Sequence, residues 1–526
     1  MSAAVLRPPT FWIKAALAAA LVIAADRLFF DADAVGTSLG LFALAWSAAA
    51  ALATPAVLRD PTGRLALLWA VAFAAVNLER PTLVGWLLFG LSLGVAVLAP
   101  RAGPAEDAWR WLQRVLLQGL KGLGGPLLDF RRLGAPRLRR RAPGLGAVAA
   151  NAVLPLAGGL LFLWLFGVAN PVIQGLLPEL GLPRIEPARW VFWAMASVAV
   201  WGILRPRFLR RPRDVAEAAG DLLLPGVTPA SITLSLIVFN ALFALQNGLD
   251  IAFLWSGAAL PEGMTHAEYA HRGAYPLVFT ALLAGLFVLV FLRPGSPTAS
   301  LPLVRRLVML WVAQNLLLVA STILRTLAYV DAYSLTTLRI AALLWMGLVA
   351  VGLGLVGWRL VRGKSTSWLI NANVAAAAGV LALCSVIDLS AVAAAWNVRH
   401  AREAGGRGAP LDVCYLERVG EAALVSLAEL ERRPLPADLR LRVQGVRERG
   451  QTRLALRQAD WRGWSFRGAR RLARVQQLAA GVTPLPPGVS WGCAGRSPAV
   501  AAPPAPPPAA PARPTAPLTA PAQPRT

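Results

Sequence analysis

Apolar residues gather in blocks of about twenty along most of the chain, with polar and basic stretches between them. Blocks of that length match the hydrocarbon thickness of a bilayer, whereas a soluble core would show amphipathic periods. The pattern therefore predicts an all-α fold, a polytopic transmembrane helical bundle of about eleven spans. We expect these spans near residues 11–29, 35–53, 64–78, 81–99, 145–169, 188–204, 230–256, 274–292, 305–328, 337–360 and 367–388. The third and fourth are short and are joined by NLERP, which predicts either a tight hairpin or a re-entrant element.

Composition supports the membrane class, because 56% of the residues are hydrophobic and only 15% are charged. The net charge of +25 would suggest nucleic acid in a soluble chain, but no nucleic-acid motif accompanies it and we expect no such partner. Basic residues instead follow the loops. An N-terminus on the cytoplasmic side places 24 of them inside and 7 outside, up to the last span.

This asymmetry predicts a multi-pass protein of the bacterial inner membrane, with its N-terminus cytoplasmic and its C-terminus extracytoplasmic. The abundance of Ala, Arg, Gly and Pro is typical of a bacterial genome rich in G and C, and no cleavable signal peptide is evident. We expect five segments: 1–100 with spans one to four, 101–144 as a basic cytoplasmic segment, 145–396 with spans five to eleven, 397–480 as a small extracytoplasmic helical domain, and 481–526 as a disordered Pro/Ala-rich tail.

The cytoplasmic stretch AEDAWRWLQRVLLQ has an apolar helical face, and the basic FRRLGAPRLRRR follows it. Trp109, Leu112, Val115 and Leu116 share that face. The pattern predicts a helix lying on anionic lipids over residues 105–141. The same charges are equally well explained as part of the positive-inside signal.

Polar residues inside the predicted spans form two stripes: Asn240, Asn247 and Asp250 on one, and Gln314, Ser321 and Arg325 on the other. Charges at membrane depth usually face a partner or a wet cavity. We therefore expect Asp250 and Arg325 to pair at the outer end of the bundle. The alternative is that each reaches the interface separately.

A larger polar cluster falls on the proposed outer side and predicts a vestibule there. Its members are Asn247, Asp250, Glu262, His266, Glu268, His271, Arg272, Arg325, Asp331, Arg339 and His400. A transporter, a membrane enzyme and a scaffold or sensor could each use it.

Enzyme chemistry has little support in the motifs. HAEYAH is not the H-E-x-x-H zinc motif, although the three histidines could still meet in space with Glu262 or Glu268 to hold zinc. LVAVGLGLVG is better explained by close helix packing than by nucleotide binding, so no catalytic residue and no cofactor are assigned.

Cys414 and Cys493 both fall in the predicted extracytoplasmic domain. An oxidising compartment would allow them to form a disulfide. The alternative is a small buried side chain at Cys414 and a loop thiol at Cys493.

From about Asn240 to Arg467 the chain resembles a bacterial membrane family known as domain of unknown function 4173, which is related to domain of unknown function 4153. The stretches that carry the resemblance are FNALFALQNGLD, LPEGMTHAEYAHRGAYPL, RTLAYVDAYSLTTLRIAALLWM, INANV, WNVRHARE, LDVCYL and DWRGW. The N-terminal spans match only in general character, apart from ANP at Ala169–Pro171. The resemblance implies a membrane location and this architecture, but no reaction, ligand or catalytic residue.

These patterns favour an envelope sensing or scaffolding component with a membrane or periplasmic protein partner. A transporter of a polar or anionic solute is the alternative, and a membrane-embedded enzyme with an outer-face site is the second.

Overall fold

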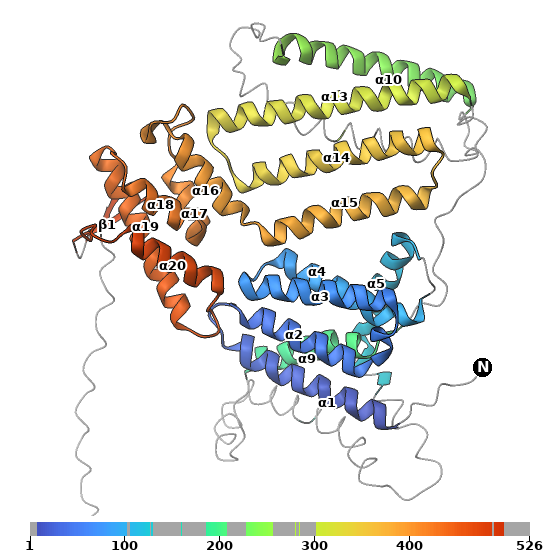
Figure 1. Ribbon diagram of the computed structural model, residues 1–526, viewed down its shortest axis with the longest axis horizontal. Coiled ribbons are helices and arrows are strands. Elements are labelled where there is room, and N and C mark those ends of the chain that lie inside the picture. Colours follow the sequence, from blue (N-terminus) through green and yellow to red (C-terminus); the bar gives the residue numbers. More distant parts are fainter. Residues whose placement is uncertain are drawn as a thin grey trace, which may run out of the picture.

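The computed structural model describes residues 8–102, 106–126, 128–129, 186–207, 228–255, 301–486 and 489–498, with single residues at 159, 279 and 283. Long helices lie side by side with similar axes, and the C-terminal helices pack together at one end of them (Figure 1). At the opposite end lies the short helix α5 (Figure 1). We call the end of the bundle that bears the C-terminal helices the outer end.

Within these residues six helices are long and apolar enough to cross a membrane. They are α3 (Pro61–Glu79), α4 (Leu83–Leu98, continued by a 3-10 turn to Arg101), α10 (Pro229–Asp250), α13 (Pro302–Tyr333), α14 (Thr337–Arg362) and α15 (Thr366–Val386). Two shorter apolar helices, α2 (Ser38–Ala53) and α9 (Pro187–Leu204), lie among them, and α1 (Pro8–Ala25) continues as a π-helical turn to Phe30. The expected spans at 145–169 and 274–292 lie outside the described residues. The chain is therefore a helical membrane protein with several spans.

The NLERP stretch is a tight turn between α3 and α4. Asn77 closes it, since its Nδ2 donates to the Phe73 carbonyl and its Oδ1 accepts from the Thr82 amide at 3.1 Å. Thr82 then caps α4 by accepting from the Gly85 amide at 3.0 Å. The sequence left open a hairpin or a re-entrant element, and the structure has a hairpin of two long apolar helices.

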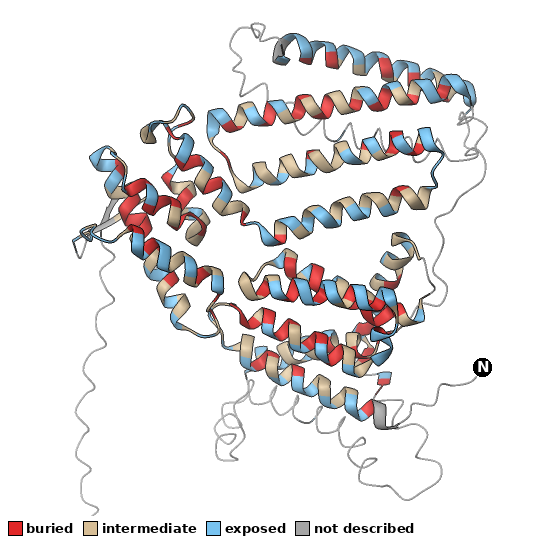
Figure 2. Cartoon of the chain, viewed as in Figure 1, coloured by how far each residue is buried: buried red, intermediate tan, exposed pale blue. Residues whose placement is uncertain are grey.

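Two apolar clusters hold the long helices together. One joins α1, α2, α3, α4 and α9, with Phe89 and Leu93 fully buried. The other joins α10, α13, α14 and α15 around Leu236 and Trp311. Many positions on the outward faces of the same helices are exposed (Figure 2). Apolar side chains are among them, such as Leu68 at 66% exposure. Exposed apolar surface of this extent is what lipid-facing helices require.

The C-terminal region is built from α16 (Leu389–His400), α17 (Val413–Val419), α18 (Leu424–Glu431), α19 (Ala437–Ala459) and α20 (Phe466–Leu478). The first four share a buried core that includes Val398, Leu416 and Leu427. α20 packs through Val475 and Leu478 in a second core with α18 and α19. A turn at 460–465 separates α19 from α20. The Trp464 amide donates to the Asp460 carbonyl in that turn.

The segment 481–526 was expected to be a disordered tail, and this expectation is wrong for residues 489–498. Strands β1 (Val489–Gly492) and β2 (Gly495–Pro498) form an antiparallel hairpin there. Trp491 lies against α19 at Gly445, where a Cβ would come within 2.2 Å of the Trp491 carbonyl oxygen. The Arg442 side chain of α19 donates to the Cys493 carbonyl at 2.8 Å and so holds the turn of the hairpin.

The predicted surface helix appears as α5 (Ala108–Leu123). Its polar face is turned inward, where Arg114 pairs with Glu106 and Gln118 donates to the Gly202 carbonyl at 3.1 Å. Leu116 and Leu120 on the other face are exposed. Residues 130–141 of the predicted lipid-binding segment lie outside the described part of the chain.

Candidate functional site

The C-terminal helices are joined directly to the loop between α1 and α2. The amides of Gly36 and Thr37 donate to the carbonyls of Arg462 and Trp464, both at 2.7 Å. Ser38 Oγ also donates to the Arg462 carbonyl at 3.1 Å. Backbone pairing of this kind fixes the loop against the DWRGW turn without depending on charge.

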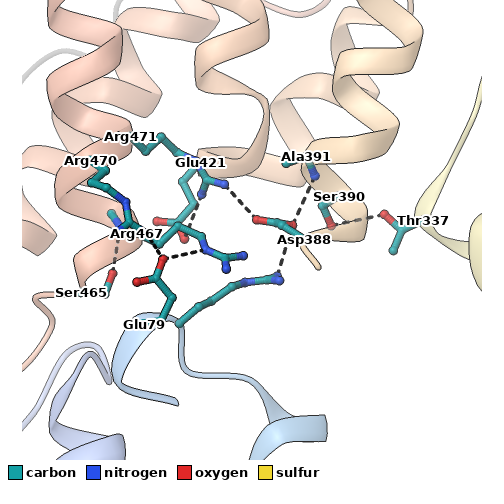
Figure 3. Close-up of polar contacts among 12 residues, drawn as sticks. Glu79, Thr337, Asp388, Ser390, Ala391, Glu421, Ser465, Arg467, Arg470 and Arg471 are labelled. Atoms are coloured by element: carbon teal, nitrogen blue, oxygen red, sulfur yellow. Dashed lines mark hydrogen bonds and ion pairs between the residues drawn. The ribbon is translucent and has the colours of Figure 1, made fainter. Parts of the chain in front are cut away.

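An ionic cluster joins the same helices to two further turns (Figure 3). Its charged members are Glu79, Arg80, Asp388, Glu421, Arg467, Arg470 and Arg471. Asp388 lies between Arg471 at 2.9 Å and Arg80 at 3.3 Å. Glu79 pairs with Arg467 at 3.4 Å and with Arg470. Carboxylates from the α3–α4 turn and the α15–α16 junction thus hold arginines of α20.

Asp388 has a double role at this junction. Its Oδ1 accepts from the Ala391 amide at 3.2 Å and so caps α16. Burial by itself would raise the pKa of this carboxyl, but the hydrogen bond from Arg471 and the charges of Arg80 and Arg471 outweigh burial and lower the pKa below its usual value. Asp388 is therefore held as a carboxylate.

A second polar site lies between α10 and α13, where the two stripes expected from the sequence face one another. Two backbone carbonyls orient Asn240, whose Nδ2 donates to Leu236 at 2.7 Å and to Leu307 at 3.1 Å. Its Oδ1 accepts from Gln314 Nε2 at 2.7 Å. Two helical turns further along α10, Asn247 Nδ2 donates to the Gln314 carbonyl at 3.1 Å.

The ion pair of Asp250 with Arg325 ends this ladder, and both side chains are almost fully buried. Gln246 Nε2 also donates to Asp250, at 2.9 Å. Residue numbers rise in the same direction on both helices, from the contact of Asn240 with Leu307 to the pair of Asp250 with Arg325. The helices α10 and α13 therefore run parallel. The expected pairing is present in the structure, and the separate-interface alternative is wrong for these two residues.

A cavity of about 320 Å³ opens at the outer end, between the last turn of α13, α16 and the loop that follows α16. Asp331 of α13 and Ser334 just after it line the cavity on one side. Trp396 and His400 line it from α16, and Arg407 from the loop. It brings together two of the predicted vestibule residues, Asp331 and His400.

The frame of the cavity is fixed by a small set of hydrogen bonds. The Asn397 side chain binds both backbone groups of Leu335, accepting from its amide at 2.7 Å and donating to its carbonyl at 2.9 Å. Tyr415 Oη accepts from the Thr337 amide at 2.9 Å. These contacts join the segments YVDAYSLTT, WNVRHARE and LDVCYL, which are far apart in the sequence.

The described vestibule residues thus fall into two places rather than one. Asn247, Asp250 and Arg325 belong to the ladder, and Asp331 and His400 to the cavity. Arg339 donates to the Ser334 carbonyl and lies over the Tyr329 ring, 4.4 Å from its centre. The other five, Glu262, His266, Glu268, His271 and Arg272, lie outside the described residues.

Sequence patterns did not single out Arg407, Trp396 or the residues of the ionic cluster. Arg407 stands in GGRG, where the glycines were the available signal. The described part of the chain holds no group of three metal-binding side chains.

Cys414 and Cys493 form a disulfide, with 4.7 Å between their Cα atoms. It joins α17 to the β-hairpin. The free-thiol alternative is therefore wrong for the structure.

Comparison with known proteins identifies the family. The model of a family described as a domain of unknown function, DUF4153, matches residues 62–430. The chain belongs to that family. No curated protein and no solved structure matches it.

The match confirms family 4153, which the resemblance named as the related family, and it does not show family 4173 itself. The matched region begins within α3, whereas the stretches that carried the resemblance begin near residue 240. The hairpin of α3 and α4 is therefore inside the family region, together with the ladder and the residues that line the cavity.

We predict that removing one charge of the buried pair is costly. Asp250→Asn or Arg325→Gln should lower the free energy of unfolding by about 3–5 kcal/mol, because the remaining charge stays buried without its counter-ion. Denaturant titration in detergent measures this, with Asp331→Asn at the exposed end of α13 as the control. Exchanging the two residues should restore much of the loss, and a double exchange that is worse than either single change would contradict the pairing.

Proposed function

We propose that the protein is an eleven-span inner-membrane protein with a cytoplasmic N-terminus. Two parallel packings support the span number. α10 and α13 run parallel, so the chain between them has to return along the bundle. α4 and α9 also end at one level, since Arg101 donates to the Pro206 carbonyl at 3.1 Å. Each parallel pair requires one further membrane crossing between its two helices. The expected spans at 274–292 and 145–169 would supply these crossings.

The distribution of basic residues supports the orientation. Among the described residues, the end of the bundle opposite the C-terminal helices carries Arg101, Arg207, Arg305 and Arg362 at helix ends. There α5 turns its apolar face outward, which suits an interfacial helix on anionic lipids.

Thiol labelling tests this topology. In a Cys384→Ala background, Asp438→Cys should react with an impermeant maleimide in intact spheroplasts, because α19 lies on the proposed outer side. Arg59→Cys, in the turn before α3, should react only after lysis. The reverse result would overturn the orientation.

For its role, we propose an envelope sensing or scaffolding component that binds a membrane or periplasmic protein. The observation that carries this proposal is the fastening of the C-terminal helices to three turns of the bundle, through Gly36, Glu79 and Asp388. A unit held in this way can pass a contact made outside to the transmembrane helices. Its exposed apolar side chains, Leu456 and Trp461, offer a surface for the partner.

Photo-crosslinking in cells tests this role. A benzoylphenylalanine at Leu456 should give one discrete protein adduct. The matched control is Leu68 in α3, which is 66% exposed against 69% for Leu456 but faces lipid in the proposed topology. Absence of a discrete adduct from Leu456, Asp438 and Trp461 alike would contradict the scaffold.

The buried ladder favours transport of a polar or anionic solute as a second candidate. Amide and charged side chains at membrane depth are costly and usually mark a pathway. Solute-dependent uptake that is lost in Asn240→Leu, with the protein still folded, would favour it over the scaffold.

A further inference from the structure

The cavity at the outer end has charges of both signs that do not neutralise one another. Asp331 lines it from α13 and Arg407 from the loop after α16. Both side chains are exposed, and among the described residues neither of them makes a hydrogen bond or an ion pair. Opposite charges that share a cavity without pairing leave room for a ligand that carries both complementary charges.

Arg407 is presented to the cavity by a rigid loop. The amides of Gly406 and Gly408 donate to the carbonyls of Ala401 and His400, at 2.9 and 2.8 Å. A Cβ at Gly406 would come within 2.4 Å of the His400 backbone, and one at Gly408 within 2.7 Å. The two glycines are therefore required for the loop to close over the end of α16 with Arg407 between them. Arg402 Nε fastens the loop further by donating to the Gly408 carbonyl at 2.8 Å.

The His400 ring is also fixed in its orientation by two contacts with Trp396. Its ring stacks on Trp396, with 3.9 Å between centres and 19° between planes. Its Nδ1 lies 2.9 Å from the Trp396 carbonyl, which can only accept, so Nδ1 carries the proton. In the neutral ring Nε2 is then an acceptor, the same role that the Asp331 carboxylate has.

We propose that this cavity binds a small zwitterion, a molecule with an ammonium group and an anionic group a few bonds apart. Arg407 binds the anionic group through charge-assisted hydrogen bonds. Asp331 and His400 Nε2 accept from the ammonium. A volume of about 320 Å³ is at the small end of ligand cavities and suits a molecule of amino-acid size.

Two sources share this chemistry, a free amino acid and the headgroup of an ethanolamine phospholipid. The cavity lies at the outer end of α13, where either could reach it. The inference deepens the proposed sensing role, because the ligand would bind where α13, α16 and the C-terminal loop meet.

Binding to the purified full-length protein in lipid-exchanged detergent tests the inference. The probes are glycine, alanine and glycerophosphoethanolamine, and the controls are acetate and ethanolamine, which each carry one charge. We expect a zwitterion to raise the thermal unfolding midpoint in a concentration-dependent way and to bind more tightly than either single-charge control. Binding of glycine or alanine identifies a free solute, and binding of glycerophosphoethanolamine alone identifies the lipid headgroup.

Asp331→Asn and Arg407→Gln should each weaken zwitterion binding by about tenfold or more, because each removes one of the two charge contacts. Asp438→Asn and Arg399→Gln, exposed changes of the same kind outside the cavity, should leave binding unchanged. Size-exclusion profiles and the intact disulfide check that every variant folds. Failure of all three zwitterions to bind, equal binding of acetate or ethanolamine, or equal loss in the control variants would overturn the inference. If a zwitterion binds but no protein is crosslinked at Leu456, the scaffolding role is rejected and the proposed ligand site stands.

Discussion

The outer end of this protein depends on contacts between the C-terminal helices and short turns of the transmembrane bundle. A turn such as 80–82 has no core of its own, and it joins two helices that are long and apolar enough to cross a membrane. Glu79 and Asp388 hold the arginines of α20, and Gly36 and Thr37 pair with the DWRGW backbone. Ion pairs that are partly buried and share partners persist better than single surface pairs. The turns and the C-terminal helices therefore form one structure.

The two polar sites follow one another along α13. The ladder between α10 and α13 ends in the buried pair of Asp250 and Arg325, below the outer end of the bundle. The cavity lies about one and a half helical turns further along α13, at Asp331. Because α13 contributes to both, a shift of its outer end would alter both sites. A ligand in the cavity and a partner on the C-terminal helices would act on the same helix.

Much of the fold could be predicted from the sequence, because hydrophobic blocks report the bilayer directly. The stripes on α10 and α13 also predicted the pair of Asp250 with Arg325, since each stripe ends in one charge and a charge at membrane depth usually faces a partner. The ionic cluster could not be predicted in this way. Glu79 and Arg470 are far apart in the chain, and nothing in their neighbourhoods indicates which turn meets which helix.

The cavity was predicted only in part for a similar reason. Asp331 and His400 were included because topology placed them on one side. Arg407 was not, because its role depends on a loop closed by backbone contacts that only glycine permits. The β-hairpin within the expected tail shows the same limit, since a disulfide and arginine contacts to backbone carbonyls create its order rather than any strand pattern.

Hydrogen exchange of the loop that contains Gly36 and Thr37 tests the central claim most directly. In the full-length protein both amides donate to carbonyls of the DWRGW turn, so the account predicts slow exchange, comparable to that of α19. Exchange at the rate of an open loop would contradict it, because the C-terminal helices would then be tethered to the bundle without being fastened to it.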